Sequence, residues 1–327
     1  MKILVTGGAG FIGSNLAYRL LDLGGEVLIV DNLRTGFFEN VDPRGGFRHI
    51  DILDPEFEQA CIDFAPDVIV HLAALVFVAE SFEHPELAHQ INVEGTRAVA
   101  RAAKACGAER VVFASSAAVY DVSDQPLRES SPLNPISPYG KSKLEAEAVL
   151  EHELRGSGVD FAIFRFANVY GPRQSTVGEG GVVAMFCEAL ATGNAPVILG
   201  TGEQVRDFIF VADVVTGLVS AIGGEIEFAQ DPATTEQPGI YNLSTGIGTS
   251  VNEIAAALRF HAKFFRPFEY GPARPGDVPY AVLNPSKAAG VFEYATEVTF
   301  ERGLALTWMW FATKHGVEIA GMEGFDD

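Results

Sequence analysis

The sequence predicts an α/β protein in which a doubly wound parallel sheet is followed by a smaller C-terminal α/β domain. Three observations support this fold class. Short apolar runs typical of buried parallel strands alternate with helical stretches through the first half of the chain. A glycine-rich turn joins the first of these runs to the first helix. After Gly171 the density of proline and glycine rises and the helical stretches become shorter, which indicates a second domain.

Length and composition exclude several classes of protein. With 327 residues, 48% hydrophobic and 20% charged, the chain is long enough for one large or two medium globular domains. A net charge of −20 argues against nucleic acid as a partner, since the phosphate backbone requires a basic surface. No signal peptide and no apolar run of membrane-spanning length is found, and the three cysteines show no disulfide or metal spacing. We therefore expect a cytoplasmic protein without a metal site.

The first strand and the turn after it carry the signature of a dinucleotide site. Ile3-Leu4-Val5 leads into Thr6-Gly7-Gly8-Ala9-Gly10-Phe11-Ile12-Gly13, and an amphipathic helix follows from about Asn15 to Leu23. Glycines at this spacing permit a tight turn and a close approach of a pyrophosphate to the helix N-terminus. A second strand, Val27 to Val30, ends in Asp31, where a carboxylate binds an adenosine ribose and repels a 2′-phosphate. The pattern predicts a Rossmann-type domain that prefers NAD to NADP.

The next strands bring further groups to the same edge of the sheet. A third run, Phe47 to Ile50, is followed by Asp51-Ile52, which lies where it could meet the adenine. A fourth, Val68 to His71, runs into Ala73-Ala74, whose small side chains allow a ligand to approach the backbone closely. His71 itself is predicted to be a packed or capping histidine.

The following strand presents two serines. A helix over 86–106 is ended by Gly107, and the apolar run Arg110 to Ala114 then delivers Ser115 and Ser116 to its carboxyl end. Ligands of open α/β sheets bind outside these ends, so a serine here could hydrogen-bond a substrate hydroxyl.

A tyrosine and a lysine four residues apart begin the next helix. Pro138 suits a first helical turn, and the residues from Leu144 to Leu150 are strong helix formers, so Tyr139 and Lys143 are expected to share one helix face. A nearby ammonium favours the tyrosinate and lowers the phenol pKa, which would make Tyr139 a general base. The Tyr-x-x-x-Lys pattern alone is weak evidence for a catalytic pair, and the motifs that precede it in the chain strengthen that interpretation.

Together these motifs resemble the extended short-chain dehydrogenase/reductases, and most closely the NAD-dependent nucleotide-sugar epimerases of the UDP-glucose 4-epimerase type. The resemblance rests on the glycine loop, Asp31-Asn32-Leu33, Asp51-Ile52, His71 to Ala74, Ser115 to Tyr120 and the Tyr139/Lys143 pair, and it continues to about Thr313. It implies that Tyr139, Lys143 and Ser116 are catalytic. It also implies that NAD is bound by Gly7, Gly10, Phe11, Ile12, Gly13, Asp31, Asn32, Asp51, Ile52, Leu72, Ala73, Ala74, Tyr139 and Lys143.

The second half of the chain resembles the substrate-binding segments of the same family. By this resemblance Asn168, Arg206 and Arg274 hold the nucleotide diphosphate, and Asp277 lies near the uridine ribose. Ala281 falls where residue size sets the room around the sugar C2 substituent, so an N-acetyl group is expected to fit.

The expected domain boundaries follow from the same segments. Residues 1–170 form the NAD-binding domain, to which 206–243 returns, residues 171–205 and 244–313 bind the nucleotide sugar, and 314–327 are a tail. The resemblance further implies a homodimer formed through the helices at 86–106 and 139–154.

Two alanines narrow the reaction. Related dehydratases and decarboxylases carry acidic residues where this chain has Ala117 and Ala118, and alanine cannot transfer a proton. This leaves oxidation followed by re-reduction. The resemblance implies that both occur at C4 and interconvert UDP-glucose and UDP-galactose, and Ala281 extends the expectation to the N-acetylhexosamine pair. Two alternatives stay open. One is a nucleotide-sugar oxidoreductase with net redox change or a different sugar, and the other is a non-catalytic NAD-binding regulator.

Overall fold

The computed structural model describes residues 1–177, 180–223, 239–273, 278–292 and 294–318. Its largest sheet has seven strands in the order β10-β6-β5-β4-β1-β2-β3, and every neighbouring pair is parallel. The strands are β1 (Lys2–Thr6), β2 (Glu26–Asp31), β3 (Gly46–His49), β4 (Val68–His71), β5 (Arg110–Ser116), β6 (Asp160–Phe166) and β10 (Ile240–Leu243). The predicted doubly wound parallel sheet is confirmed.

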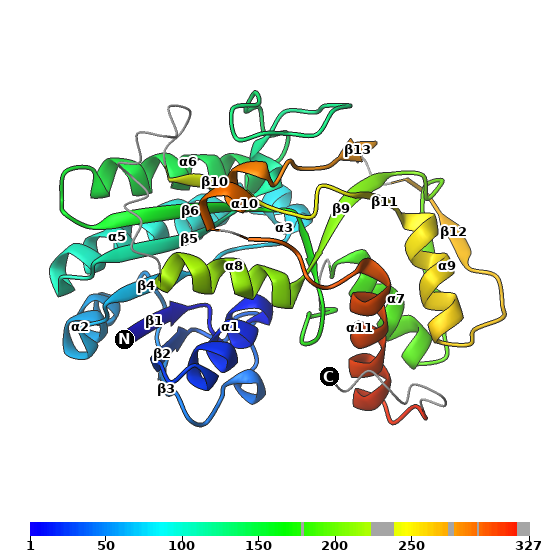
Figure 1. Cartoon of the computed structure of the whole chain (residues 1–327), viewed down its shortest axis with the longest axis horizontal. Helices are drawn as coiled ribbons and strands as arrows, with labels where there is room; N and C mark the ends of the chain where they lie inside the picture. The colour runs from blue at the N-terminus through cyan, green and yellow to red at the C-terminus, as the bar shows by residue number, and fades with distance from the viewer. Residues whose placement is uncertain (178–179, 224–238, 274–277, 293, 319–327) are drawn as a thin grey trace.

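Helices cover both faces of this sheet (Figure 1). On one face α1 contacts α8, and on the other α2, α5 and α6 pack side by side. The helices of this domain, including short 3₁₀ and π segments, are α1 (Phe11–Asp22), η1 (Phe38–Asn40), α2 (Pro55–Phe64), α3 (Val78–Glu83), α4 (Pro85–His89), η2 (Gln90–Glu94), α5 (Gly95–Cys106), η3 (Ala117–Val119), α6 (Pro138–Leu154), α8 (Val211–Gly223) and α10 (Ser286–Phe292).

The apolar core follows from the alternation of side chains along the strands. Ile3 and Val5 of β1 belong to the core cluster that includes the buried residues of α1 and α8. Leu4, between them, belongs to the cluster under α2, α5 and α6. Because successive side chains of a strand point to opposite faces, a strand covered on both sides is apolar throughout.

A second, smaller domain is built on a four-stranded sheet. Its strands are β7 (Asn168–Tyr170), β9 (Val205–Phe210), β11 (Gly248–Ser250) and β13 (Tyr280–Ala281), and β8 (Val197–Leu199) pairs separately with β12 (Glu269–Gly271). Helices α7 (Val182–Ala191), α9 (Val251–His261) and α11 (Phe300–Lys314) pack together beside these strands, on the right of Figure 1.

The chain crosses between the two domains at other positions, and more often, than the sequence suggests. β10 joins the seven-stranded sheet next to β6, and α8 packs against α1. The preceding strand β9, however, pairs with β7, β11 and β13, so the chain enters the large domain at α8 and not at Arg206. α10 also packs on β10 and α8, although it follows the small-domain strand β13.

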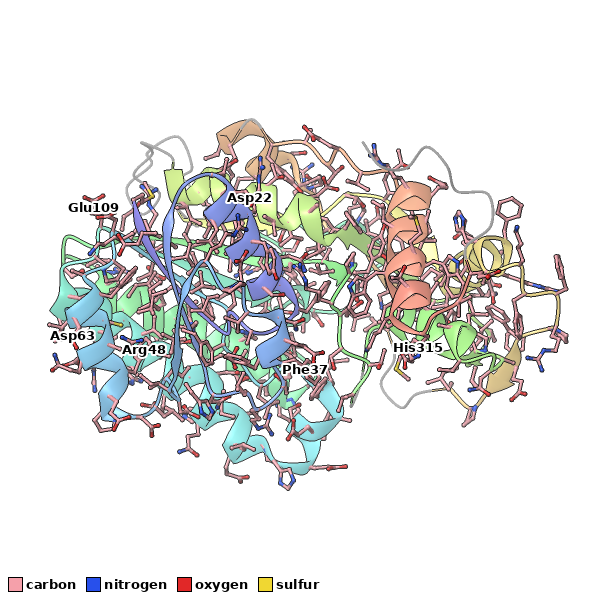
Figure 2. The ribbon with its side chains drawn as sticks, turned by 90° about the horizontal axis from the view of Figure 1, so that it is seen from below. Asp22, Phe37, Arg48, Asp63, Glu109 and His315 are labelled. Atoms are coloured by element: carbon pink, nitrogen blue, oxygen red, sulfur yellow. The ribbon has the colours of Figure 1, made fainter. Side chains whose placement is uncertain are left out.

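Side-chain contacts tie the C-terminal helix to its neighbours. His315, just after α11, lies with its Nε2 3.0 Å from Glu188 Oε1 of α7 (Figure 2). Thr299 caps the start of α11 by accepting a hydrogen bond from the Arg302 backbone N–H. Among the described residues, no helix is long and apolar enough to cross a membrane.

Candidate active site

The start of α6 holds the tyrosine in place. The Ser137 hydroxyl accepts a hydrogen bond from the Gly140 N–H (3.0 Å), and Pro138 occupies the first turn, where no N–H is needed. The Tyr139 N–H donates to Ser81 Oγ of α3 (3.0 Å). Tyr139 and Lys143 therefore lie one turn apart on a helix whose first turn is anchored from two directions.

Ser116 contacts the tyrosine from the end of β5. Its hydroxyl lies close enough to the Tyr139 side chain to lower the Tyr139 pKa, and it accepts a hydrogen bond from the Ala118 N–H (3.2 Å). Burial raises the pKa of Tyr139 above its ordinary value, and the Ser116 hydroxyl opposes that rise. This differs from the sequence expectation that Lys143 would dominate the Tyr139 pKa and lower it.

Lys143 is almost completely buried. Its Nζ donates a hydrogen bond to the Ala114 carbonyl (2.9 Å) and lies 5.0 Å from the centre of the Phe113 ring. Burial lowers the Lys143 pKa to about 8, against a raising effect of the Glu147 carboxylate. The ammonium thus binds the Ala114 carbonyl, and with a pKa of about 8 Lys143 is mainly charged at neutral pH.

The glycine loop has little space for side chains. Gly7 has φ +69°, and a Cβ there would lie 2.7 Å from the Ala73 N atom. A Cβ on Gly13 would lie 2.3 Å from the Gly7 carbonyl oxygen. α1 begins at Phe11 after Gly10, which provides no capping side chain. The first N–H groups of α1 therefore lack helical and capping partners, an arrangement that fits a dinucleotide pyrophosphate.

The acidic residues predicted to bind adenosine lie beside this loop. Asp31 accepts hydrogen bonds from the Ala9 N–H (3.0 Å) and the Leu33 N–H (2.8 Å), and burial raises its pKa. Asn32 Nδ2 donates to Asp51 Oδ2 (2.7 Å). These contacts bring Asp31, Asn32 and Asp51 together at the carboxyl ends of β2 and β3. The neighbouring Ile52 is buried.

Behind the glycine loop lies a buried histidine that is not exposed to a substrate. Thr96 Oγ1 donates to the Asn92 carbonyl (2.6 Å), so it accepts from His71 Nε2 (3.1 Å), which leaves Nδ1 to accept from Thr6 Oγ1 (2.8 Å). Burial lowers the His71 pKa to about 3 and keeps the ring neutral. The Ala73 N–H donates to the same Thr6 hydroxyl (3.3 Å). His71 thus supports the loop that starts with Leu72, Ala73 and Ala74.

Sequence reasoning missed two buried groups. Asn92, in the π-helical segment, binds both the N–H and the carbonyl of Leu75 (2.8 and 3.1 Å) and donates to Ser142 Oγ of α6 (2.8 Å). Glu147 forms an ion pair with Arg165 (2.7 Å), and both are buried. The signals were present, since Glu147 follows Lys143 by four residues and Arg165 interrupts an apolar strand.

Three of the predicted substrate residues lie on the small sheet. Register pairs Ala281 of β13 with Arg206 of β9, and Asn168 of β7 with Phe208. The Asn168 side chain donates to the Asp207 carbonyl (3.1 Å), and Arg206 Nη1 donates to the Val205 carbonyl (2.9 Å). Asn168, Arg206 and Ala281 thus share one sheet. Arg274 and Asp277 lie outside the described residues.

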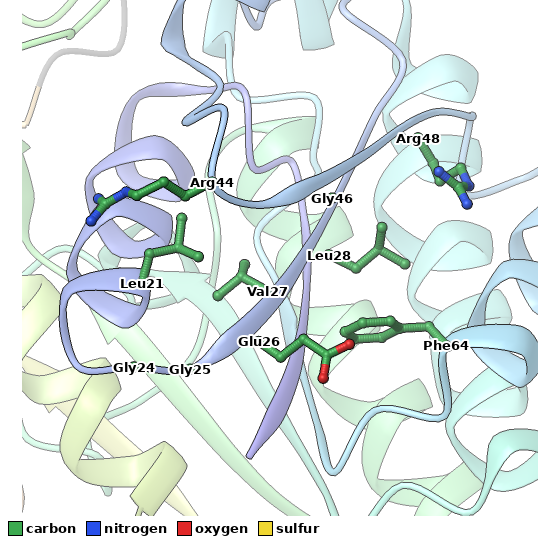
Figure 3. A pocket seen from close by; sticks show the side chains of 10 residues that line it. All are labelled: Leu21, Gly24, Gly25, Glu26, Val27, Leu28, Arg44, Gly46, Arg48 and Phe64. Atoms are coloured by element: carbon green, nitrogen blue, oxygen red, sulfur yellow. The ribbon is translucent and has the colours of Figure 1, made fainter.

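A surface hollow elsewhere carries none of this chemistry. It lies at the amino ends of β2 and β3 and at the end of α1, and Figure 3 shows Leu21, Glu26, Arg44, Arg48 and Phe64 among its lining side chains. Arg44 is paired with Asp42 and, at 2.8 Å, with Asp22. Because the predicted site residues follow the carboxyl ends of the strands, this hollow is separate from them.

Known proteins resemble this chain over nearly its whole length. A family model described as "NAD dependent epimerase/dehydratase family" matches residues 3–243. A UDP-glucose 4-epimerase of Mycolicibacterium smegmatis is 37% identical over 96% of this chain and 99% of its own.

Two solved structures are similar in fold as well. The UDP-glucose 4-epimerase of Thermotoga maritima, solved with UDP-glucose, is 35% identical, has a TM-score of 0.88, and the alignment covers 96% of this chain and 99% of that one. A UDP-N-acetylglucosamine 4-epimerase of Methanobrevibacter ruminantium, in complex with UDP-N-acetylmuramic acid, is 30% identical with a TM-score of 0.87, over 96% and 98% of the two chains.

Proposed function

The chain belongs to the NAD-dependent epimerase/dehydratase family, and from this premise we propose that it interconverts the two C4 epimers of a UDP-sugar. The observation that carries the proposal is the Ser116–Tyr139 contact, one helical turn from Lys143, with alanine at both positions that follow Ser116. Without an acidic side chain at Ala117 and Ala118, elimination and decarboxylation lack a proton-transfer group. Oxidation at C4 followed by reduction on the other face of the sugar needs no acidic side chain at these two positions.

NAD is the cofactor of this enzyme. The glycine loop and the N-terminus of α1 would hold its pyrophosphate, and Asp31 would bind the adenosine ribose. The negative charge of Asp31 disfavours a 2′-phosphate, so NAD is preferred to NADP. When bound, NAD⁺ supplies the capacity to accept hydride from C4 of the sugar and to give it back.

Tyr139, Lys143 and Ser116 share the proton chemistry. Tyr139 removes the proton of the sugar 4-hydroxyl and returns it at the end of the cycle. Ser116 donates a hydrogen bond that holds the same oxygen as hydroxyl and as ketone. Lys143 provides the positive charge that favours the Tyr139 phenolate. Burial lowers the Lys143 pKa to about 8 and raises the Tyr139 pKa, so Lys143 favours the phenolate only while it is itself charged, and the reactive form is the ammonium–phenolate pair.

The small domain grips the nucleotide and leaves the sugar free to turn. Asn168, Arg206 and Arg274 bind the diphosphate, and Asp277 meets the uridine ribose. Guanidinium groups suit this task because they bind phosphate oxygens in pairs. Support comes from the register that aligns Ala281 with Arg206, since a methyl side chain beside the diphosphate leaves room at the sugar. We therefore expect N-acetylhexosamines to be accepted besides glucose and galactose.

The assembly and the compartment follow as further parts of the proposal. A homodimer would use α5 and α6, which pack side by side on one face of the large sheet. Arg97, Lys104 and Glu153 form an ion-pair group there, and light scattering on the purified protein would give the mass. The three cysteines are free, which agrees with a reducing cytoplasm. A role in galactose metabolism follows only from the proposed UDP-galactose substrate.

The test uses two substrates and one variant. The purified protein is incubated with UDP-galactose and, separately, with UDP-N-acetylgalactosamine, while nucleotide-sugar products are resolved and NADH absorbance is followed. We expect both C4 epimers to form without accumulation of NADH. NADH that rises in step with product would indicate a net oxidoreductase, and absence of any epimer would refute the proposal. A Tyr139→Phe protein that epimerised at the normal rate would exclude Tyr139 as the base.

A further inference from the structure

A single buried carboxylate joins three elements behind the proposed catalytic residues. Glu147 lies on α6, one helical turn after Lys143, and both side chains are buried. Arg165 of β6 donates to both carboxylate oxygens, from Nε to Oε1 (3.0 Å) and from Nη2 to Oε2 (2.7 Å). The Ser115 hydroxyl of β5 donates to Oε1 as well. A paired arginine and a hydroxyl thus compensate this buried charge.

The sheet register explains why both strands reach the same carboxylate. Ser115 of β5 and Arg165 of β6 are directly paired in the parallel ladder. Arg165 is held from its other side, because its Nη1 donates to Tyr120 Oη and to the Glu129 carbonyl (both 3.1 Å). The position of Glu147 is therefore set by two strands of the central sheet and not by its own helix alone.

Three consecutive residues at the end of β5 each contact α6. The Ala114 carbonyl accepts a hydrogen bond from Lys143, Ser115 donates one to Glu147, and the Ser116 hydroxyl interacts with the Tyr139 side chain. The outer two contacts involve the groups assigned to proton transfer. The middle contact involves a group with no part in the reaction, yet it is the one secured by an ion pair.

We propose that Glu147 is a positioning residue for the epimerisation: by binding Ser115 and Arg165 together it fixes the distance between Ser116 on β5 and the Tyr139/Lys143 pair on α6. This inference rests on the proposed function, because it assigns the role of Glu147 from that of its three neighbours. Glu147 also supplies a negative charge next to a buried ammonium, and this gives the proposal a measurable pH signature.

The charged and titratable groups around Lys143 set the direction of that signature. His71 on β4 is neutral, Arg165 on β6 is positive, and Tyr139 and Glu147 are on α6 itself. Glu147 opposes the lowering of the Lys143 pKa by burial. If its charge is removed, Lys143 loses its proton at a lower pH, and the ammonium–phenolate pair is populated less. The basic limb of the kcat profile should then move to lower pH.

The experiment compares Glu147→Gln with wild type as NAD-loaded enzyme. We expect kcat to fall about tenfold or more, as when a general base loses its partner. The basic limb of kcat should move to lower pH, while KM for the UDP-sugar stays within about twofold, because the diphosphate residues lie elsewhere. The second readout is the titration of the Tyr139 phenol by near-ultraviolet absorbance, as the difference from a matching Tyr139→Phe protein. Its pKa should rise in Glu147→Gln, because the Ser116 hydroxyl, which lowers it, is no longer held beside Tyr139.

Three further variants separate positioning from folding. Glu151→Gln removes a carboxylate of the same helix whose side chain is 45% exposed and pairs with Arg155, and it should change neither readout. Glu147→Leu combined with Arg165→Met removes the pair without leaving a buried charge, so it should fold. We expect it to keep a low kcat, since Ser115 still has no carboxylate to bind. Ser115→Ala should give a smaller change of the same kind.

The outcomes are distinct. An unchanged kcat profile and Tyr139 titration in Glu147→Gln would overturn the proposal, and so would a double variant with wild-type kcat, because the pair would then serve folding alone. If the wild type epimerises neither UDP-sugar, the proposed function fails. The Tyr139 titration still decides the role of Glu147 in that case, because it requires no turnover.

Discussion

Replacing Lys143 with methionine should stabilise the fold while it removes activity. The native Lys143 pKa of about 8 lies well below its ordinary value of 10.5 because the ammonium is buried. At about 1.4 kcal/mol for each pH unit, that difference means that charged Lys143 costs the native state about 3 kcal/mol below pH 8. Methionine of similar size avoids the cost but loses the hydrogen bond to Ala114, which contributes about 1 kcal/mol. The net gain expected at pH 7 is about 2 kcal/mol.

The pH dependence distinguishes this explanation from better packing. Below pH 8 the lysine is charged in the folded and unfolded states, so the gain of the variant is complete. Between about 8 and 10.5 the unfolded chain binds the proton that native Lys143 has lost, so the wild type gains stability relative to the variant as pH rises. Near pH 10.5 the advantage should vanish or reverse.

Urea unfolding of both proteins, stripped of nucleotide, at several pH values between 7 and the alkaline limit of reversibility measures this difference. A variant less stable than wild type at pH 7 would refute the reasoning. A stability gain that does not change with pH would refute it too.

The remaining predictions concern the cofactor loop and the small domain. Gly13→Ala would place a Cβ 2.3 Å from the Gly7 carbonyl oxygen, so bound NAD in the purified protein should fall by about tenfold or more. Gly290→Ala, which meets no atom within 4 Å, is the control and should retain NAD. Asp31→Asn should weaken the binding of NAD and reduce the preference for NAD over NADP, as measured by the ratio of the two Kd values. Asp207→Asn turns an amide toward the Thr245 and Gly246 N–H donors, and should destabilise the fold by about 1–3 kcal/mol in urea unfolding.

Short-range patterns were enough to predict the strand–turn–helix unit and the helix that carry the expected cofactor residues. The glycine spacing and Asp31 are fixed by the local geometry of one strand–turn–helix unit, and the Tyr139/Lys143 pair is fixed by one turn of α6. In each case the contacts depend on residues that are near in sequence, so a pattern is enough to predict the placement.

Contacts between distant segments could not be predicted in this way. The Glu147 carboxylate meets Ser115 and Arg165 only because β5 and β6 pair in one register and α6 crosses behind them. The same limit applies to β9. Its sequence predicts a strand, but the sheet that the strand joins depends on pairing with distant segments. The Tyr139 pKa depends on burial, which the spacing of two residues does not determine.

The return of hydride to the carbon that lost it is the central claim, and an isotope label tests it most directly. UDP-galactose carrying deuterium at C4 is converted by the enzyme, and the UDP-glucose formed is examined by mass spectrometry and NMR. A transient oxidation within the site predicts that the product keeps the deuterium at C4 on the inverted carbon. Loss of the label to solvent, or its appearance in released NADH, would contradict the mechanism.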